Sequence, residues 1–130
     1  FLKYRTYHGC SMSLAVQKAS ELAWSDEQHV INNRALYADK FISAAEILEG
    51  RMDTRDPGAG FYLWAKTPGA CDTFSRELFE ATGVTVLPGQ YLGREVDGFN
   101  PGAGFVRMAL VAEPETCKEA LRRVNSYITR

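Results

Sequence analysis

The chain has 130 residues, of which 45% are hydrophobic, and a formal net charge of −1. This length suits one compact domain that buries a core without disulfides or metal. The interspersed charges exclude a nucleic-acid stripe and a polybasic membrane patch, and no apolar run approaches the roughly 20 residues of a membrane span. Three widely spaced cysteines, Cys10, Cys71 and Cys117, favour a reducing compartment. We therefore expect a cytoplasmic protein without nucleic-acid or membrane partners.

The first third of the chain predicts two helices. The chain begins at Phe1, without methionine and inside an aromatic stretch, so we expect a piece of a longer polypeptide. Apolar residues recur at helical spacing over residues 11–24. Ser25, followed three residues later by glutamine, has the form of a capping box and predicts a second helix over residues 26–48, with Lys40 on its polar face.

The middle of the chain predicts two strands and a helix. Residues 51–60 contain aspartate, proline and glycine, which predicts a short strand or an extended piece that ends in a turn. The aromatic run at 61–65 predicts a second strand. Asp72 or Thr73 can cap the following helix, and Gly83 is the expected end of that helix.

The last third predicts two strands and a final helix that starts near Pro114. We expect the strands over residues 84–87 and 105–111, joined by a loop over 88–104. Compact domains seldom keep so long a loop unless it binds something or covers a site. The element order α, α, β, β, α, β, β, α predicts an α+β fold with a small, mostly antiparallel sheet and helices packed on one face.

Arg107 is the candidate binding residue, because it is the one charge in the last predicted strand. On the alternation of a strand, Arg107 shares a face with Phe105 and Ala109, whereas Val106 and Met108 point to the other face. A buried guanidinium needs a partner, and its planar fork holds a carboxylate in two parallel hydrogen bonds. The residues alone leave two interpretations open: an anionic ligand, or a strand arginine paired with a protein carboxylate or lying at the sheet edge.

Other kinds of chemistry find no support in the sequence. The chain has no pair of CxxC motifs and no HExxH motif, and His8 and His29 stand alone, so no metal site is expected. The glycines of the long loop match neither GxGxxG nor a P-loop. The five lysines fall on predicted polar faces or at loop ends, so none has the desolvated setting of a catalytic amine.

Four motifs resemble, in order and spacing, the C-terminal small domain of fold-type I, class I and II aminotransferases, which use pyridoxal 5'-phosphate. They are GFYLWAK at 60–66, GVTVLPGQYLG at 83–93, GFVRMALV at 104–111 and EALRRV at 119–124. The segments YRTYHGCSMS and WSDEQHV, near the start of the chain, look most like the succinyldiaminopimelate aminotransferases of bacterial lysine biosynthesis.

The resemblance implies an amino transfer between N-succinyl-LL-2,6-diaminopimelate and 2-oxoglutarate in a homodimeric enzyme. It assigns the substrate α-carboxylate to Arg107. It leaves two interpretations of Arg5, as a contact for a distal carboxylate of the substrate or as a surface arginine. It also implies that residues 1–24 are a remnant of the inter-domain and dimer-contact segment, and that residues 25–130 are the small domain.

The cofactor lysine and phosphate contacts would lie in a large domain outside this chain. We therefore expect no catalytic and no cofactor-binding residue here, and no activity from the 130-residue piece alone. The alternative, from a different class, is a free-standing α+β ligand-binding or regulatory module in which Arg107 receives an acidic metabolite.

Overall fold

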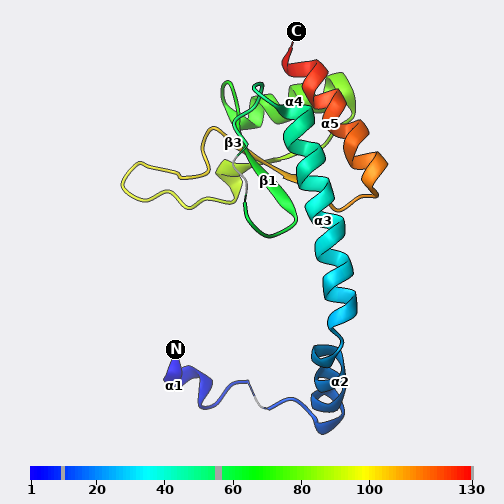
Figure 1. Ribbon diagram of the computed structural model, residues 1–130. Helices are drawn as coiled ribbons and strands as arrows, with labels where there is room; N and C mark the ends of the chain where they lie inside the picture. Colours follow the sequence, from blue (N-terminus) through cyan, green and yellow to red (C-terminus); the bar gives the residue numbers. More distant parts are fainter. Residues whose placement is uncertain (10, 55–56, 130) are drawn as a thin grey trace. The chain divides into compact units, whose positions relative to one another are not determined.

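The computed structural model describes residues 1–9, 11–54 and 57–129, so Cys10 lies outside the described residues. The described chain forms two compact units, Phe1–Arg34 and Ala35–Arg130. None of the described helices is both long enough and apolar enough to cross a membrane. The elements (Figure 1) are α1 Leu2–Arg5, α2 Leu14–Ser25, α3 Glu27–Leu48, β1 Tyr62–Lys66, α4 Cys71–Thr82, β2 Leu87–Pro88, the 3-10 helix η1 Gly89–Tyr91, β3 Phe105–Ala109 and α5 Pro114–Ile128.

The first unit holds α1, α2 and the start of α3, and α1 and α2 contribute no buried residue. The predicted capping box at Ser25 is wrong, because Ser25 is still part of α2 and its hydroxyl donates to the Glu21 carbonyl at 2.8 Å. The Asp26 carboxylate instead accepts the Gln28 N–H, at 3.1 Å, where α3 begins. A hydrogen bond from His29 lowers the pKa of the Asp26 carboxyl.

The second unit is built on a three-stranded antiparallel sheet in the order β1-β3-β2. The predicted α+β fold with a small antiparallel sheet is therefore confirmed. The strand predicted over 84–87 is shorter, at Leu87–Pro88, and Pro88 has no N–H with which to extend the ladder. Of the two alternatives predicted for 51–60, the strand is wrong for the described residues: Thr54 makes one isolated bridge to Ala65, and Gly58 is in the left-handed region, at φ 63°.

One hydrophobic core joins the sheet to the three longer helices of this unit. Along β3, Val106 and Met108 are buried, whereas Phe105 and Arg107 are half-buried and Ala109 is exposed. This alternation confirms the predicted division of the strand into two faces. The buried apolar residues are Ala44, Leu48, Met52, Leu63, Ala65, Cys71, Phe74, Leu78, Val86, Val106, Met108, Leu110, Cys117, Leu121 and Val124.

In this unit the glycine and proline signals of the sequence predict the helix ends correctly, whereas the predicted side-chain cap is not formed. Helix α4 begins after Ala70 without a side-chain cap, so the predicted cap at Asp72 or Thr73 is wrong. Asp72 lies in the first turn instead, where the helix dipole favours a negative charge. Gly83 ends α4 at φ 72°, and Pro114 begins α5, both as predicted.

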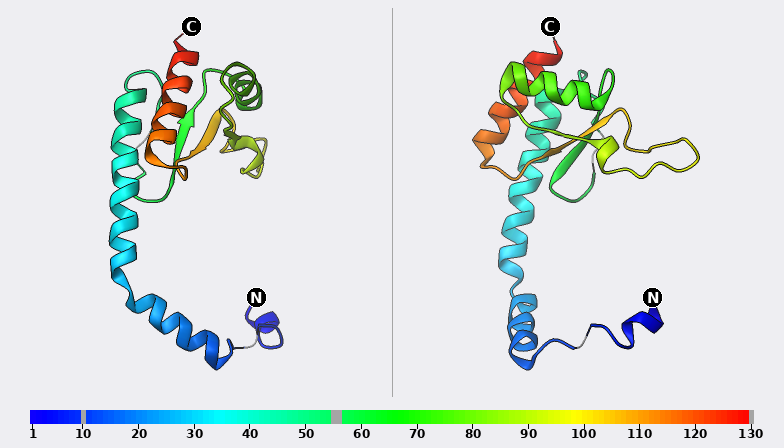
Figure 2. Two further views of the ribbon diagram at one scale, coloured as in Figure 1. Left: turned by 90° about the vertical axis from the view of Figure 1, so that its right-hand side faces the viewer. Right: turned by 180° about the vertical axis from the view of Figure 1, so that it is seen from behind.

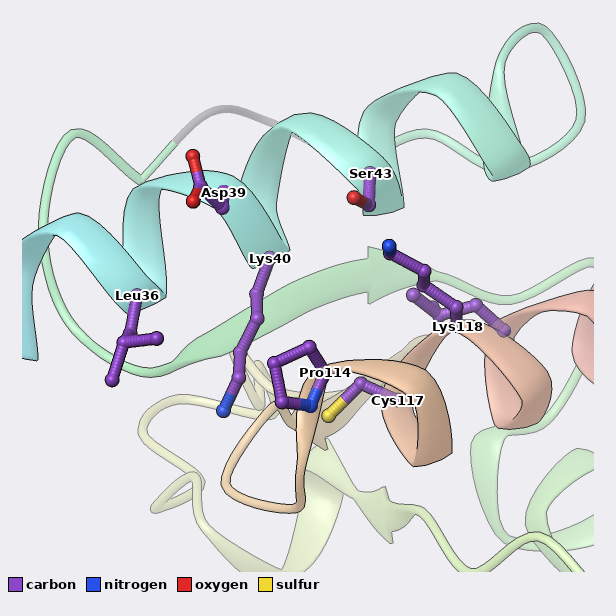
Figure 3. Close-up of a pocket in the computed structure, with 8 residues that line it drawn as sticks. Leu36, Asp39, Lys40, Ser43, Pro114, Cys117 and Lys118 are labelled. Atoms are coloured by element: carbon purple, nitrogen blue, oxygen red, sulfur yellow. The ribbon is translucent and has the colours of Figure 1, made fainter.

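Lys40 is buried, which corrects its predicted place on the polar face of the long helix. Its side chain is 9% exposed, and its ammonium donates to the carbonyl oxygens of Leu110, at 2.9 Å, and Ala112, at 2.7 Å. The ammonium also lies 4.9 Å from the centre of the Tyr37 ring. Figure 3 shows the side chain crossing from α3 past Pro114 at the start of α5.

The position of Lys40 follows from helical spacing. Leu36, Lys40, Ala44 and Leu48 are four residues apart, so their side chains share one stripe of α3. The lysine stem lies along a pocket of about 130 Å³, and the charge reaches the backbone at its end. The ammonium thereby ties α3 to the segment that leaves β3.

We predict that Lys40→Met lowers the free energy of unfolding by about 1–3 kcal/mol, because methionine fills the stem volume and leaves the two carbonyls without their donor. Urea denaturation measures the change. Lys118→Met is the matched control: its ion pair with Glu115, at 2.8 Å, is partly exposed, so the expected loss is below about 1 kcal/mol. Equal losses of unfolding free energy in the two variants would show that the buried hydrogen bonds of Lys40 stabilise the fold no more than an exposed ion pair does.

Candidate functional site

Arg107 occupies the middle of the central strand of the sheet. Trp64 of β1 lies opposite it on one side and Leu87 of β2 on the other. Since directly opposed residues point to the same face, the side of the sheet away from Val106 and Met108 carries Arg107 among aromatic neighbours. The residues on this face of β1 and β3 are Tyr62, Trp64, Phe105, Arg107 and Ala109.

The surroundings of Arg107 decide between the interpretations that the sequence left open. The sheet-edge interpretation is wrong, because strands pair with β3 on both sides. Among the described residues, the ion pairs within 4.0 Å join His29, Lys118, Arg122 and Arg123 to acids, and Arg107 makes none. Arg107 is half-buried, although its strand is otherwise fit for burial. Its donors therefore face a side of the sheet where no described carboxylate meets them.

Aromatic rings define the two sides of the guanidinium. The Arg107 Cζ atom lies 5.5 Å from the centre of the Tyr62 ring, within the range of a cation–π contact. Trp64 stacks instead on Phe105, with 5.8 Å between ring centroids and an interplanar angle of 16°. The arginine side chain thus lies toward Tyr62, and the Trp64–Phe105 stack forms the neighbouring wall.

Two glycines bring the η1 turn against the base of the long loop. A Cβ atom on Gly89 would lie 2.5 Å from the Gly102 carbonyl oxygen and 2.8 Å from Cη2 of Trp64. Asn100 braces the same place, because its amide donates to the Gln90 carbonyl at 3.0 Å and its oxygen accepts the Gly102 N–H at 2.9 Å. The close backbone approach holds Trp64 beside Arg107.

The rest of the long loop forms a hairpin that projects from the sheet (Figure 2). Val96 and Phe99 exchange two backbone hydrogen bonds around the Asp97-Gly98 turn, where both residues have positive φ, 52° and 77°. Such a turn suits the twist of a two-stranded hairpin. Its apolar side chains are exposed, with Val96 at 60% and Phe99 at 70%.

Arg5, the second candidate, lies on α1 in the first unit and is exposed. Its guanidinium lies against the backbone of Gly9, which leaves no room for a Cβ atom there. Arg107 belongs to the other unit. The roles expected for Arg5 and Arg107 both remain predictions at this point.

Sequence reasoning missed three residues that shape this region. The predicted helix face of Lys40 is wrong, although its spacing from the buried Ala44 and Leu48 is that of one helix stripe. Asn100 precedes a Pro-Gly pair, a turn signal that could have indicated its brace on the backbone. The contact between Tyr62 and Arg107 crosses two strands and depends on their register, which the sequence does not state.

The five lysines, none of which the sequence places in the setting of a catalytic amine, are either engaged by other groups or exposed. Lys40 donates to two carbonyls, Lys118 pairs with Glu115, and Lys3, Lys18 and Lys66 are exposed. Moreover, no buried side-chain nitrogen or oxygen of the described residues lacks a hydrogen-bond partner. No group of three or more histidine, cysteine or acidic residues that could hold a metal occurs in this part of the chain either.

Comparison with known proteins gives a matching family model and curated relatives of similar sequence. The family model "Aminotransferase class I and II" matches residues 2–124. An LL-diaminopimelate aminotransferase from Maridesulfovibrio salexigens is 31% identical over 115 residues, which are 85% of this chain and 28% of that protein. The chain therefore spans less than a third of the length of this curated relative.

Solved structures of aminotransferases are also similar to this chain. An aminotransferase from Neisseria meningitidis is 48% identical with a TM-score of 0.87, over 98% of this chain and 33% of that one. A probable N-succinyldiaminopimelate aminotransferase from Thermus thermophilus is 35% identical with a TM-score of 0.58, over 70% of this chain and 23% of that one.

We predict that Gly89→Ala destabilises the second unit by about 1–3 kcal/mol, because the added methyl group must displace backbone or Trp64. Chemical denaturation followed by tryptophan fluorescence measures both the stability and the environment of Trp64. Gly69→Ala is the matched control, since nothing lies within 4 Å of a Cβ atom there, and its effect should stay within about 0.5 kcal/mol. A neutral Gly89→Ala would contradict the close approach.

Proposed function

Because the chain belongs to the class I and II aminotransferase family, whose members use pyridoxal 5'-phosphate, we propose that it serves as the substrate-carboxylate-binding domain of such an enzyme. Arg107 receives the α-carboxylate of the amino-acid substrate. The observation that carries this proposal is a half-buried guanidinium on the central strand with no acid of the described chain beside it. The transferase activity belongs to the complete protein, and the cofactor lysine lies outside the residues described here.

The chemistry of amino transfer explains why an arginine suits this role. The reaction requires one bond at Cα to stand perpendicular to the cofactor ring, so the substrate must be held against rotation. Two parallel hydrogen bonds from one guanidinium fix both the position and the plane of a carboxylate. A lysine would supply the charge as a single point and would leave the carboxylate free to turn.

For the substrate, we propose N-succinyl-LL-2,6-diaminopimelate as amino donor and 2-oxoglutarate as acceptor, in bacterial lysine biosynthesis. The name of the Thermus thermophilus relative supports this pair. The names of the curated relatives support a second candidate, LL-diaminopimelate itself. The two donors share the α-carboxylate and differ at the distal end, where one carries a succinyl carboxylate and the other an ammonium group.

At that distal end we propose Arg5, an exposed arginine on α1, as the contact for the succinyl carboxylate. The resemblance of the segment at 4–8 to the loop that approaches the neighbouring subunit's site in related dimers supports a homodimer in which this arginine serves the partner subunit's site. A cytoplasmic location fits the metabolic substrates. No observation on this chain favours the alternative of a free-standing regulatory module.

In the complete enzyme, Arg107→Lys should lower kcat/KM for the amino donor about 10- to 150-fold, because one of two charge-assisted hydrogen bonds is lost. Steady-state kinetics with both substrates measure the change. Arg76→Lys, an exposed position on α4, is the matched control and should leave kcat/KM unchanged. Wild-type kinetics in Arg107→Lys would remove the basis of the proposal.

The choice of donor is tested by comparing kcat/KM for N-succinyl-LL-diaminopimelate and LL-diaminopimelate, with 2-oxoglutarate as acceptor. The succinylated donor should be favoured about 10-fold or more, the value of one charge-assisted hydrogen bond. Arg5→Gln should abolish this preference, whereas Lys3→Gln on the same short helix should preserve it. A preference for LL-diaminopimelate in the wild type would select the second candidate donor.

A further inference from the structure

We propose that Tyr62 is a positioning residue for Arg107, whose ring supports the guanidinium so that its N–H edge is presented to the substrate carboxylate. This inference rests on the proposed function of Arg107. Tyr62 lies on β1 opposite Ala109, and it is therefore diagonal to Arg107 across the β1–β3 pair. Diagonal neighbours on one face of a sheet lie within reach of long and aromatic side chains.

The register explains why the arginine lies over Tyr62 and not over the ring directly opposite. Trp64 is the direct partner of Arg107, but its ring stacks on Phe105. On the other side, the small side chain of Ala109 leaves Tyr62 uncovered. The arginine side chain can therefore lie along β3 toward Ala109, which brings its Cζ atom to 5.5 Å from the Tyr62 ring centre.

A ring is a better support than an acid for an arginine that must bind a ligand. The attraction between a guanidinium and an aromatic face uses the flat side of the cation and leaves its N–H donors free. A protein carboxylate would occupy those same donors and compete with the substrate. The aromatic support thus restricts the rotamers of Arg107 without consuming its binding capacity.

The Tyr62 ring is itself held in place by its neighbours. Phe61 contacts Tyr62 edge to face, with ring centroids 5.3 Å apart and an interplanar angle of 84°. The Phe61 carbonyl accepts the Leu110 N–H at 2.8 Å, which continues the pairing of the two strands beyond β1. Tyr62 is 36% exposed, so its ring is accessible on the side of the sheet where the ligand would arrive.

The test compares Tyr62→Leu and Tyr62→Phe in the complete enzyme. Loss of the ring in Tyr62→Leu should raise KM for the amino donor about 2- to 5-fold, the range expected for an exposed cation–π contact, with kcat little changed. Tyr62→Phe keeps the ring and should restore the wild-type KM. Phe79→Leu, an exposed aromatic residue on α4, is the matched control and should leave KM unchanged.

Two further measurements separate positioning from a general structural effect. With an amine that lacks the α-carboxylate, Tyr62→Leu should leave kcat/KM unchanged. In an Arg107→Met background, Tyr62→Leu should add no further rise in KM, because the two side chains act on one contact. If Tyr62→Leu does not fold, as judged by circular dichroism, Tyr62→Met takes its place in the same assays.

The outcomes distinguish the inference from the function on which it rests. A raised KM in Arg107→Met together with an unchanged KM in Tyr62→Leu overturns the role of Tyr62 alone. Equal losses for the donor and for the amine without a carboxylate overturn it as well, since they indicate a general disturbance of the sheet. An unchanged KM in Arg107→Met overturns the proposed function, and the role of Tyr62 with it.

Discussion

The structure of the second unit depends on the two-faced character of strand β3. Val106 and Met108 belong to the core, while Arg107, between them in sequence, points to the opposite side of the sheet. Neighbouring residues of one strand therefore serve different purposes: Val106 and Met108 make the hydrophobic contacts that stabilise the fold, and Arg107 carries the charge proposed to bind a ligand. Because the core specifies the register of the strand, it also specifies where the guanidinium lies.

Several contacts hold this strand from its ends and its flanks. Lys40 reaches the carbonyls of Leu110 and Ala112 just after β3, and the Cys117 thiol donates to the Ala112 carbonyl at 3.2 Å. Before β3, the backbone of Gly102 lies against that of Gly89. The chain is thus held on both sides of Arg107, after β3 by side-chain hydrogen bonds to carbonyl oxygens and before it by close backbone packing.

Family membership and coverage together define what this chain contributes. The family model covers almost the whole chain, yet the chain spans about a third of the solved neisserial relative. The described residues carry an arginine on an aromatic face and no anchor for the cofactor. We propose a division of labour in which this domain orients the substrate carboxylate and another part of the enzyme holds the reactive group.

The sequence by itself determined the features that depend on local periodicity and on single residues: the α+β class with a small antiparallel sheet, the two faces of β3 with Arg107 on one of them, the end of α4 at Gly83 and the start of α5 at Pro114. Only the tertiary structure decided what depends on register and on contacts between distant elements. It excluded Arg107 from the sheet edge, placed Tyr62 beside it, and buried Lys40 against carbonyls 70 and 72 residues away. The physical reason is that periodicity specifies which face a side chain occupies, whereas the neighbour that it meets there is set by how the elements pack.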